Sequence, residues 1–453
     1  MKERLFVGID LGGKFHQVQV TNTSGERVGR SFRISRGRRG LSELSAGLTA
    51  RSGGQEYEAI YTVEATQNFW LELVHPLVRS GARVHLVSPS KSSALRTFYR
   101  RHTKTDTIDA GALSQLPVVD PTLPPVFVGS PRFDVLRRLV RQYWQLKTAM
   151  SARKRRIMTR VLMVYPGYEE VFRNRYCGAS LLFCRRYLDP SRARRLGRKR
   201  LEQLLCHRAC GKFDAARGAR LWEVIENAPE LDLDYEDLQF LVNQDLDLLE
   251  AEERSKTALK ERIAEVYSEV DPELRLQSLP GLGEILAAAI TAFVGEPGRF
   301  DNANQAVALS GLYPREKASA GSETPNQRLS RQGDPTLRSV LYVAAEIMRH
   351  YDPELRAFHQ RLTGRGKHYK KASCALAAKI LRRCFAILRD QRAYHVTGAG
   401  LLAEARTRGG KTVRQSVSEV AERLNDEFGS TPLVEGAYAC AEPRSTTTTR
   451  NGA

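Results

Sequence analysis

The sequence has no run of about 18 consecutive apolar residues, so it predicts no membrane-spanning helix. Its first residues, Met1–Asp10, lack the apolar core and small-residue cleavage site of a signal peptide. Only 7 cysteines occur in 453 residues, and an odd number argues against a disulfide framework. No internal repeat is visible. These absences argue against a membrane protein and a disulfide-rich secreted protein, and they favour a reducing cytoplasm.

Acidic residues are outnumbered, with 51 Asp and Glu against 71 Lys and Arg, a net charge of +20. Residues 153–220 hold 19 basic and 5 acidic residues, mostly through the runs 153–156 and 192–200, whereas residues 226–254 hold 11 acidic residues and one basic one. Such an excess predicts a polyanionic partner, most simply nucleic acid, away from the acidic block. The alternative is that both blocks are solvated helix faces. The contacts predicted in the basic block are Arg153, Lys154, Arg155 and Arg156.

Apolar alternation predicts a mixed α/β domain over residues 1–120. Three strands of an antiparallel meander are expected at 4–11, 15–21 and 27–34, the second of them half-buried. Strand–helix alternation follows, with strands at 58–64 and 82–88 and helices at 67–80 and 106–116. The proline-rich stretch 117–131 is typical of a linker.

The rest of the chain is expected to be mostly helical. A central all-α region at 125–275 includes a long charged helix with a broken apolar stripe, which is either a coiled-coil arm or an ordinary packed helix. A mostly α domain is expected at 276–395, and a polar, partly disordered tail at 396–453. The helices expected in the third region lie at 284–294, 304–312, 335–349 and 372–389.

Four carboxylates stand out from this background: Asp10 inside the first apolar strand, Glu64 at the end of the fourth, and Asp106 and Asp109 one turn apart on a helix. An ionised group in an apolar strand is unfavourable unless it is paired or binds a cation. Oxygen ligands of this kind suit Mg²⁺ or Mn²⁺, and two such ions can stabilise both oxygens of a phosphodiester displacement. The alternative is structural: strand ends and helix starts are ordinary capping positions, and Asp106 could cap its helix beside Thr105.

The order and context of these acids resemble a known family. Val7–Gly12, Val63–Thr66 and Lys104–Ala110 are similar to the motifs of RuvC-like DEDD transposases, which mobilise insertion sequences of the one-ten family. The third region resembles the C-terminal transposase domain of that family. The matching stretches there are Leu279–Gly283, Ala308–Glu316 and Arg328–Asp334.

The resemblance implies an RNase H-like N-terminal domain whose Asp10, Glu64, Asp106 and Asp109 bind Mg²⁺, or Mn²⁺. It further implies a serine that attacks a DNA phosphodiester and becomes covalently linked to DNA, in an active site shared between protomers of a tetramer. A non-coding bridge RNA would pair with donor and target DNA, in the bacterial cytoplasm at the nucleoid. The serine maps to Ser319; because the usual Ser-Gly-Gly run reads Ser-Ala-Gly here, Ser322 is a rival.

Other residues are candidates for phosphate contact. Arg328 and Arg331, with Lys317, surround the candidate serine in the sequence and could stabilise developing charge. Gly281 and Gly283 form a turn before an apolar helix, which is either a phosphate-binding turn or a plain helix start. A further cationic run precedes the Asp-x-x-Asp helix and could guide a phosphate backbone: Arg96, Arg100, Arg101, His102 and Lys104.

Two motifs are weaker. Cys206, His207 and Cys210 lack a second ligand pair at zinc-finger spacing, so incidental thiols are the better interpretation. His16, on the second strand, could approach Asp10, although a satisfied surface histidine is more common.

Two other functions remain open beside a recombinase. A structure-selective nuclease resembling a junction resolvase would use the four acids without a serine. A nucleic-acid-binding protein without chemistry would need neither.

Overall fold

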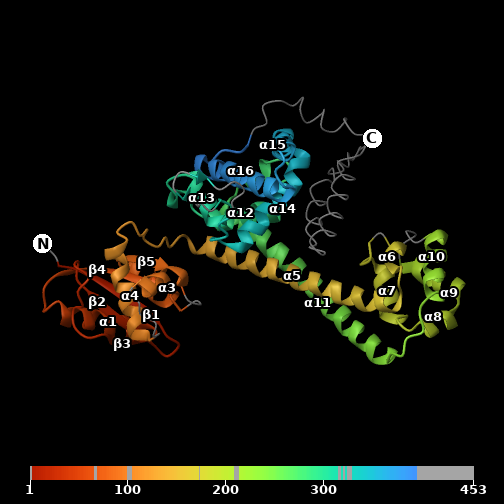
Figure 1. Ribbon diagram of the computed structural model, residues 1–453, viewed down its shortest axis with the longest axis horizontal. Coiled ribbons are helices and arrows are strands. Elements are labelled where there is room, and N and C mark those ends of the chain that lie inside the picture. The colour runs from red at the N-terminus through yellow and green to blue at the C-terminus, as the bar shows by residue number, and fades with distance from the viewer. Residues whose placement is uncertain are drawn as a thin grey trace, which may run out of the picture. The chain divides into compact units, whose positions relative to one another are not determined.

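The computed structural model describes residues 3–65, 69–98, 105–172, 174–208, 214–314, 318–319, 322–323 and 329–394. Contacts divide the chain into two compact units, Met1–Val128 and Gly129–Ala453, and most of their helices and strands are labelled in Figure 1. Within the described ranges, no helix combines the length and apolar character needed to cross a bilayer.

The first unit contains a five-stranded sheet in the order β3-β2-β1-β4-β5. The meander is confirmed, because β1 pairs antiparallel with β2, and β2 with β3; β4 then lies parallel to β1, and β5 parallel to β4. The third strand begins at Phe32 instead of residue 27, because Gly29 adopts a φ of +73° that a strand cannot contain. The strands are β1 (Glu3–Leu11), β2 (Phe15–Thr21), β3 (Phe32–Ser35), β4 (Tyr57–Glu64) and β5 (Arg83–Val87).

Helices cover both faces of this sheet, so β2 is buried on both sides and not half-buried as expected. Two helices, α1 and α3, were not predicted, and α4 runs through Pro117 to Val119, three residues into the expected linker. The mixed α/β character is confirmed. The helices are α1 (Arg38–Arg51), α2 (Leu71–Arg79), α3 (Pro89–Phe98) and α4 (Asp106–Val119).

The second unit begins with the expected all-helical region. Its aromatic residues Tyr165, Tyr168 and Phe183 are fully buried in a core that also contains side chains of α7 and α9. Along the long helix α11, the apolar stripe is divided: Leu249 is buried, whereas Leu248 is 49% exposed. The helices are α5 (Pro131–Val164), α6 (Tyr168–Val171), α7 (Gly178–Arg186), α8 (Pro190–Leu196), α9 (Arg198–Arg208), α10 (Ala215–Glu226) and α11 (Tyr235–Val270).

A second core in this unit joins the C-terminal helices to both long helices. Leu136 and Val140 at the start of α5, and Ile263 and Val266 at the end of α11, pack with α12, α14 and α16. All four helices predicted in this region are present; α15 was missed. The elements are η1 (Arg275–Ser278), α12 (Glu284–Val294), η2 (Pro297–Arg299), α13 (Ala303–Ser310), β6 (Ala318–Ser319), β7 (Ser322–Glu323), α14 (Pro335–Tyr351), α15 (Pro353–Gly364) and α16 (Tyr369–Asp390). The tail at 396–453 lies outside the described residues.

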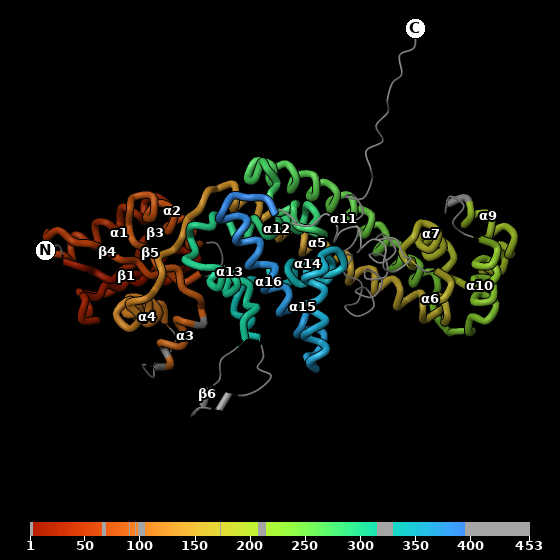
Figure 2. Tube along the Cα trace, turned by 90° about the horizontal axis from the view of Figure 1, so that it is seen from above, coloured from red at the N-terminus to blue at the C-terminus, as the bar shows by residue number. Residues whose placement is uncertain are grey.

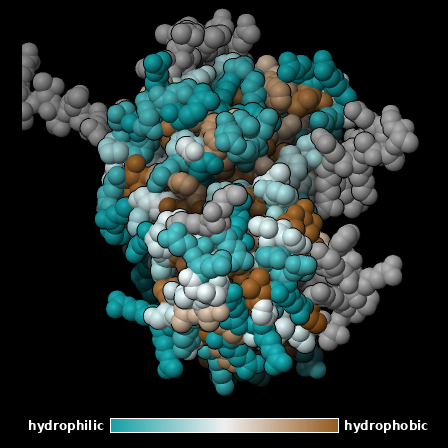
Figure 3. Space-filling view, turned by 90° about the vertical axis from the view of Figure 1, so that its left-hand side faces the viewer, coloured by the Kyte–Doolittle hydropathy of each residue, from teal (hydrophilic) through white to brown (hydrophobic). Residues whose placement is uncertain are grey.

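Few large apolar side chains are exposed among the residues that the structure describes. The face shown in Figure 3 is mainly hydrophilic, and its hydrophobic residues occur singly or in small groups. The exposed large hydrophobic side chains of the described residues include Phe240, Leu241 and Leu248, all on α11.

Candidate functional site

The register of β1 and β4 brings two of the predicted acids to neighbouring positions. These strands are parallel, and Gly8 pairs with Thr62 and Ile9 with Val63. Asp10 and Glu64 each follow by one residue, so they stand side by side where the two strands end. The first and fourth strands are therefore neighbours in the sheet.

Alternation along the strands assigns both acids to the same face of the sheet. Ile9 and Val63 belong to the core packed beneath α1 and α2. Their neighbours Gly8, Asp10 and Glu64 therefore face the opposite side, since successive strand residues point to opposite faces. That side is covered by α4, which lies beside β1 in both Figure 1 and Figure 2.

Contact between β1 and α4 is close enough to require glycine at position 8. A Cβ added to Gly8 would lie 2.1 Å from the carbonyl oxygen of Ala110 and 2.2 Å from the amide nitrogen of Ser114. Thr21 of β2 pairs with Phe6, which lies two residues before Gly8 on β1. The Oγ1 of Thr21 donates to the carbonyl of Ser114 at 3.1 Å. The helix α4 thus runs antiparallel to β1. Its first turn, which precedes Ala110, lies toward the end of β1 that carries Asp10.

The first turn of α4 carries the other two acids. Thr105 is the N-cap, and its hydroxyl accepts from the amide of Ile108 at 3.3 Å. Asp106 is the first helical residue and not the cap, which answers one of the structural alternatives. Carboxylates in the first turn are favoured by the helix dipole. Asp10 and Glu64 therefore share one edge of the sheet, and the turn that carries Asp106 and Asp109 lies toward the same edge.

These acids are gathered but not preassembled around an ion. Nowhere in the described ranges do three His, Cys, Asp or Glu side chains form a group tight enough for a metal. Glu64 Oε2 accepts a hydrogen bond from the hydroxyl of Ser92 on α3, a side chain that is 4% exposed. Carboxylate oxygens of this kind fit a hard divalent cation in chemistry.

His16 is not part of this edge. It pairs with Leu11 in the β1–β2 register, so its side chain lies on the face of α2, opposite to that of Asp10. Its Nε2 lies 3.0 Å from Glu72 Oε1, which also accepts from Arg36 Nε at 2.7 Å. The expectation of a surface histidine is wrong, because His16 is fully buried, and this burial lowers its pKa below 6.5.

The two candidate serines lie opposite each other in a short hairpin. Ser319 of β6 pairs with Ser322 of β7, so the segment that carries both serines contains two short strands. An isolated bridge between Pro314 and Leu329 and a 2.8 Å bond from the amide of Ser330 to the carbonyl of Tyr313 close its base. This backbone arrangement treats the two serines alike and favours neither.

The residues predicted to contact phosphate lie in different structural environments. Arg331 sits at the base of the hairpin with a φ of +56°, and its carbonyl accepts from Arg338 at 3.3 Å. Gly281 has a φ of +81°, and a Cβ there would lie 2.7 Å from the Tyr351 ring, so packing alone explains this glycine. Gly283 is the N-cap of α12. Several candidates lie outside the described residues or have undescribed side chains: Arg96, Arg100, Arg101, His102, Lys104, His207, Cys210, Lys317 and Arg328.

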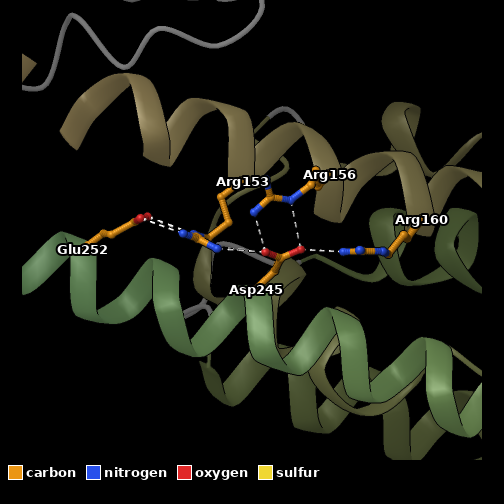
Figure 4. Close-up of polar contacts among 5 residues, drawn as sticks. All are labelled: Arg153, Arg156, Arg160, Asp245 and Glu252. Carbon is orange, nitrogen blue, oxygen red and sulfur yellow. Dashed lines mark hydrogen bonds and ion pairs between the residues drawn. The ribbon is translucent and has the colours of Figure 1, made fainter. Parts of the chain in front are cut away.

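The first basic run faces the acidic block instead of remaining apart from it (Figure 4). Asp245 of α11 accepts from Arg153 at 3.0 Å, Arg156 at 2.8 Å and Arg160 at 2.5 Å, and Glu252 binds Arg153 through two bonds of 2.8 and 3.0 Å. Asp245 is 7% exposed. Sequence reasoning missed this cluster, although the arginine spacing of three and four residues on one helix face was visible.

Two models of transposase families match parts of the chain. A model of the transposase family IS116/IS110/IS902 matches residues 273–360, and a model of DEDD transposases of the IS110 type matches residues 7–166. The first range contains both serines, and the second contains all four acids.

Individual relatives align over most of the chain or over part of it. An uncharacterized 42 kDa protein of insertion element IS900 from Mycobacterium paratuberculosis is 24% identical over 403 residues, 87% of this chain and 98% of the relative. An uncharacterized 44.8 kDa protein of IS116 from Streptomyces clavuligerus is 24% identical, over 86% of this chain and 96% of its own length. A pilin gene-inverting protein from Moraxella lacunata is 27% identical over 121 residues, 26% of this chain and 37% of that protein.

Proposed function

This chain belongs to the IS116/IS110/IS902 family of transposases, and we propose on that basis that it cuts and rejoins DNA strands as a transposase or site-specific recombinase. The observation that carries the proposal is the convergence of Asp10, Glu64 and the first turn of α4 at one edge of the sheet. Carboxylates drawn from three separate elements to one edge are typical of a site for phosphoryl transfer, and capping alone would not require it. An RNase H-like, RuvC-like fold of the first unit is part of the proposal.

The four acids would hold Mg²⁺, or Mn²⁺. The bound cation would supply Lewis-acid stabilisation of negative charge on the phosphate oxygens. For their part, Asp10 and Glu64 provide oxygens from a rigid pair of strands, and Asp106 and Asp109 provide oxygens from a capped helix. Ser92 orients Glu64 through its hydroxyl.

Ser319 would be the nucleophile, with Ser322 as the rival. The Ser319 Oγ–phosphorus bond forms as the bond from phosphorus to the 3′ oxygen breaks, and the serine proton ends on that oxygen. The products are a phosphoserine–DNA link and a free 3′-hydroxyl, which can later attack the link in the reverse sense to rejoin strands.

Assembly is also part of the proposal. Donor and target DNA, together with a non-coding bridge RNA, would dock on the basic helical region. Protomers would associate as a dimer and then as a tetramer, so that the acids and the serine of one site come from different copies. A structured non-coding segment beside the gene would support guidance by RNA.

The test is to trap the covalent intermediate. Protein incubated with end-labelled DNA and Mg²⁺ should give a labelled species that protease digestion shifts. We expect Ser319→Ala to abolish the adduct and Ser322→Ala, its neighbour across the hairpin, to retain it. Loss with Ser322→Ala alone would move the nucleophile to Ser322. DNA cleavage without any adduct would refute the recombinase and indicate a metal-dependent nuclease.

Metal dependence distinguishes the proposed recombinase from a nucleic-acid-binding protein without chemistry. Asp10→Asn should abolish cleavage and weaken binding of Mg²⁺ or Mn²⁺ measured by calorimetry. If the intact protein and Asp10→Asn bind these ions equally and neither cuts DNA, the protein binds nucleic acid without chemistry.

A further inference from the structure

The two basic runs of the second unit differ in how far the protein itself neutralises them. On α5, Arg153, Arg156 and Arg160 all bind Asp245, and Arg153 also binds Glu252 (Figure 4). These guanidinium groups already have carboxylate partners, so a phosphate would have to displace an internal ion pair to reach them.

The second basic run, on α8 and α9, is only partly neutralised by the protein itself. Residues 192–200 contain six basic side chains and no acidic one. Two of the six have internal roles: Arg194 donates to the carbonyls of Ile225 and Ala228, at 3.1 and 3.2 Å, and Arg198 binds Glu202 at 2.8 Å. Arg194 thereby fixes α8 to the end of α10.

The other four point to solvent: Arg192 and Arg195 on α8, and Lys199 and Arg200 on α9. The opposite sides of these helices are buried through Ala193, Leu201 and Leu205, so the fold holds the four charges outward. In the described part of the chain none of them forms an ion pair; Arg195 only approaches the Ser191 hydroxyl, at 3.5 Å.

We propose that these four side chains, the α8–α9 basic surface, dock the phosphate backbone of a DNA duplex. This inference rests on the proposed function, which supplies DNA as the partner. Charge complementarity supports it, since the acidic groups adjoining the run in sequence are already engaged: Asp189 caps α8 and Glu202 pairs with Arg198. Neither α8 nor α9 contains Phe, Tyr or Trp, the side chains on which unpaired bases most often stack. Long cationic side chains without base-stacking partners contact phosphates of a duplex and not its sequence.

The test compares two variants of the full chain with the same change in net charge. The first replaces the four residues of the α8–α9 basic surface with Gln. The matched control removes four exposed arginines, each paired with a carboxylate no more than four residues away, and is also made with Gln: Arg39, Arg138, Arg262 and Arg389. Binding to a labelled DNA duplex and to an RNA duplex of the same sequence is measured in EDTA over a series of salt concentrations.

We expect the first variant to bind the DNA duplex at least tenfold more weakly than the unmodified protein. The slope of log affinity against log salt should fall by about 3 to 4, because each lost phosphate contact removes about 0.9 from the slope. The control should bind within threefold of the unmodified protein with the same slope. Equal thermal melting of all three proteins would show that folding is intact.

Three outcomes would overturn the inference. Equal losses in the two variants would mean that only net charge matters. Weaker binding to the RNA duplex with unchanged binding to DNA would assign the surface to RNA. Normal DNA binding by the first variant would refute this surface while leaving the proposed recombinase intact, whereas an unmodified protein that binds no DNA would refute both.

Discussion

Replacing Asp245 with Asn removes the charge at the centre of the arginine cluster while preserving its size. Burial opposes ionisation of Asp245, but hydrogen bonds from Arg156, Arg160 and Arg153 outweigh it and lower its pKa from 3.8 to about 2. At about 1.36 kcal/mol per unit, this shift corresponds to about 2 kcal/mol of stability at neutral pH. We expect Asp245→Asn to lower the free energy of unfolding of the core that contains Tyr165, Tyr168 and Phe183 by about 2 to 3 kcal/mol. The reason is that three guanidinium groups are then left without their shared partner.

Tryptophan fluorescence can follow the unfolding of this core separately from the rest of the chain. The chain has 3 tryptophans, and only Trp222 on α10 packs against this core, so a Trp70→Phe/Trp144→Phe background reports its unfolding in urea. Asp247→Asn is the matched control, because Asp247 lies two residues away, is 57% exposed and pairs with Arg185 at 2.6 Å. An exposed pair of this kind contributes about 0 to 1 kcal/mol.

The sign of the pH dependence gives a second test. Because the folded-state pKa of Asp245 is depressed, its contribution is fully present above about pH 4 and is lost as the pH falls toward 2. The difference between the unmodified protein and Asp245→Asn should shrink over that interval. A difference below about 0.5 kcal/mol at pH 7, or a stabilised Asp245→Asn, would refute the reasoning, since buried ion clusters do not always stabilise.

Three further predictions concern the first unit. Gly8→Ala should destabilise it by about 3 kcal/mol or more, because the new methyl group would meet the backbone of α4, whereas Gly13→Ala, with nothing within 4 Å of the added Cβ, should change the urea midpoint little. Ser92→Ala should raise the Mg²⁺ concentration for half-maximal DNA cleavage by roughly tenfold, with restoration by Ser92→Thr, because Glu64 loses its orienting donor; an unchanged Mg²⁺ dependence would contradict this. Burial lowers the pKa of His16 below 6.5, so its contribution to stability is full above pH 6.5 and declines as the pH falls below it; a titration that His16→Gln leaves equally steep would exclude this residue as the cause.

The sheet could be predicted because its strands obey a simple alternation of apolar residues. β1, β2, β4 and β5 lie within two residues of their expected bounds. The proximity of Asp10 and Glu64 depended on one further condition, that the first and fourth strands be neighbours, which the sequence alone left open. The helix α1 escaped prediction because only Gly40, Leu44 and Leu48 of its 14 residues are buried, too few for a clear amphipathic pattern.

Contacts between distant side chains could not be predicted. Arg153 and Asp245 are 92 residues apart, and a single sequence does not say which of 11 acids in the block meets which arginine. For the same reason the chain alone did not separate the arginines of α5 that pair with Asp245 from the four exposed basic residues of α8 and α9. His16 was misjudged because nothing in a seven-residue strand shows that helices cover both of its faces.

The long helices have a consequence for cutting the chain into pieces. Both α5 and α11 supply apolar side chains to the two cores of the second unit, and they pack against each other between them. A fragment starting at residue 276 would leave behind Leu136, Val140, Ile263 and Val266, and its own apolar side chains would face water. Cleavage of the backbone between Asn227 and Asp234, in contrast, would place α5 in one piece and α11 in the other. The two pieces would stay associated, and the nick would become visible only under denaturing conditions.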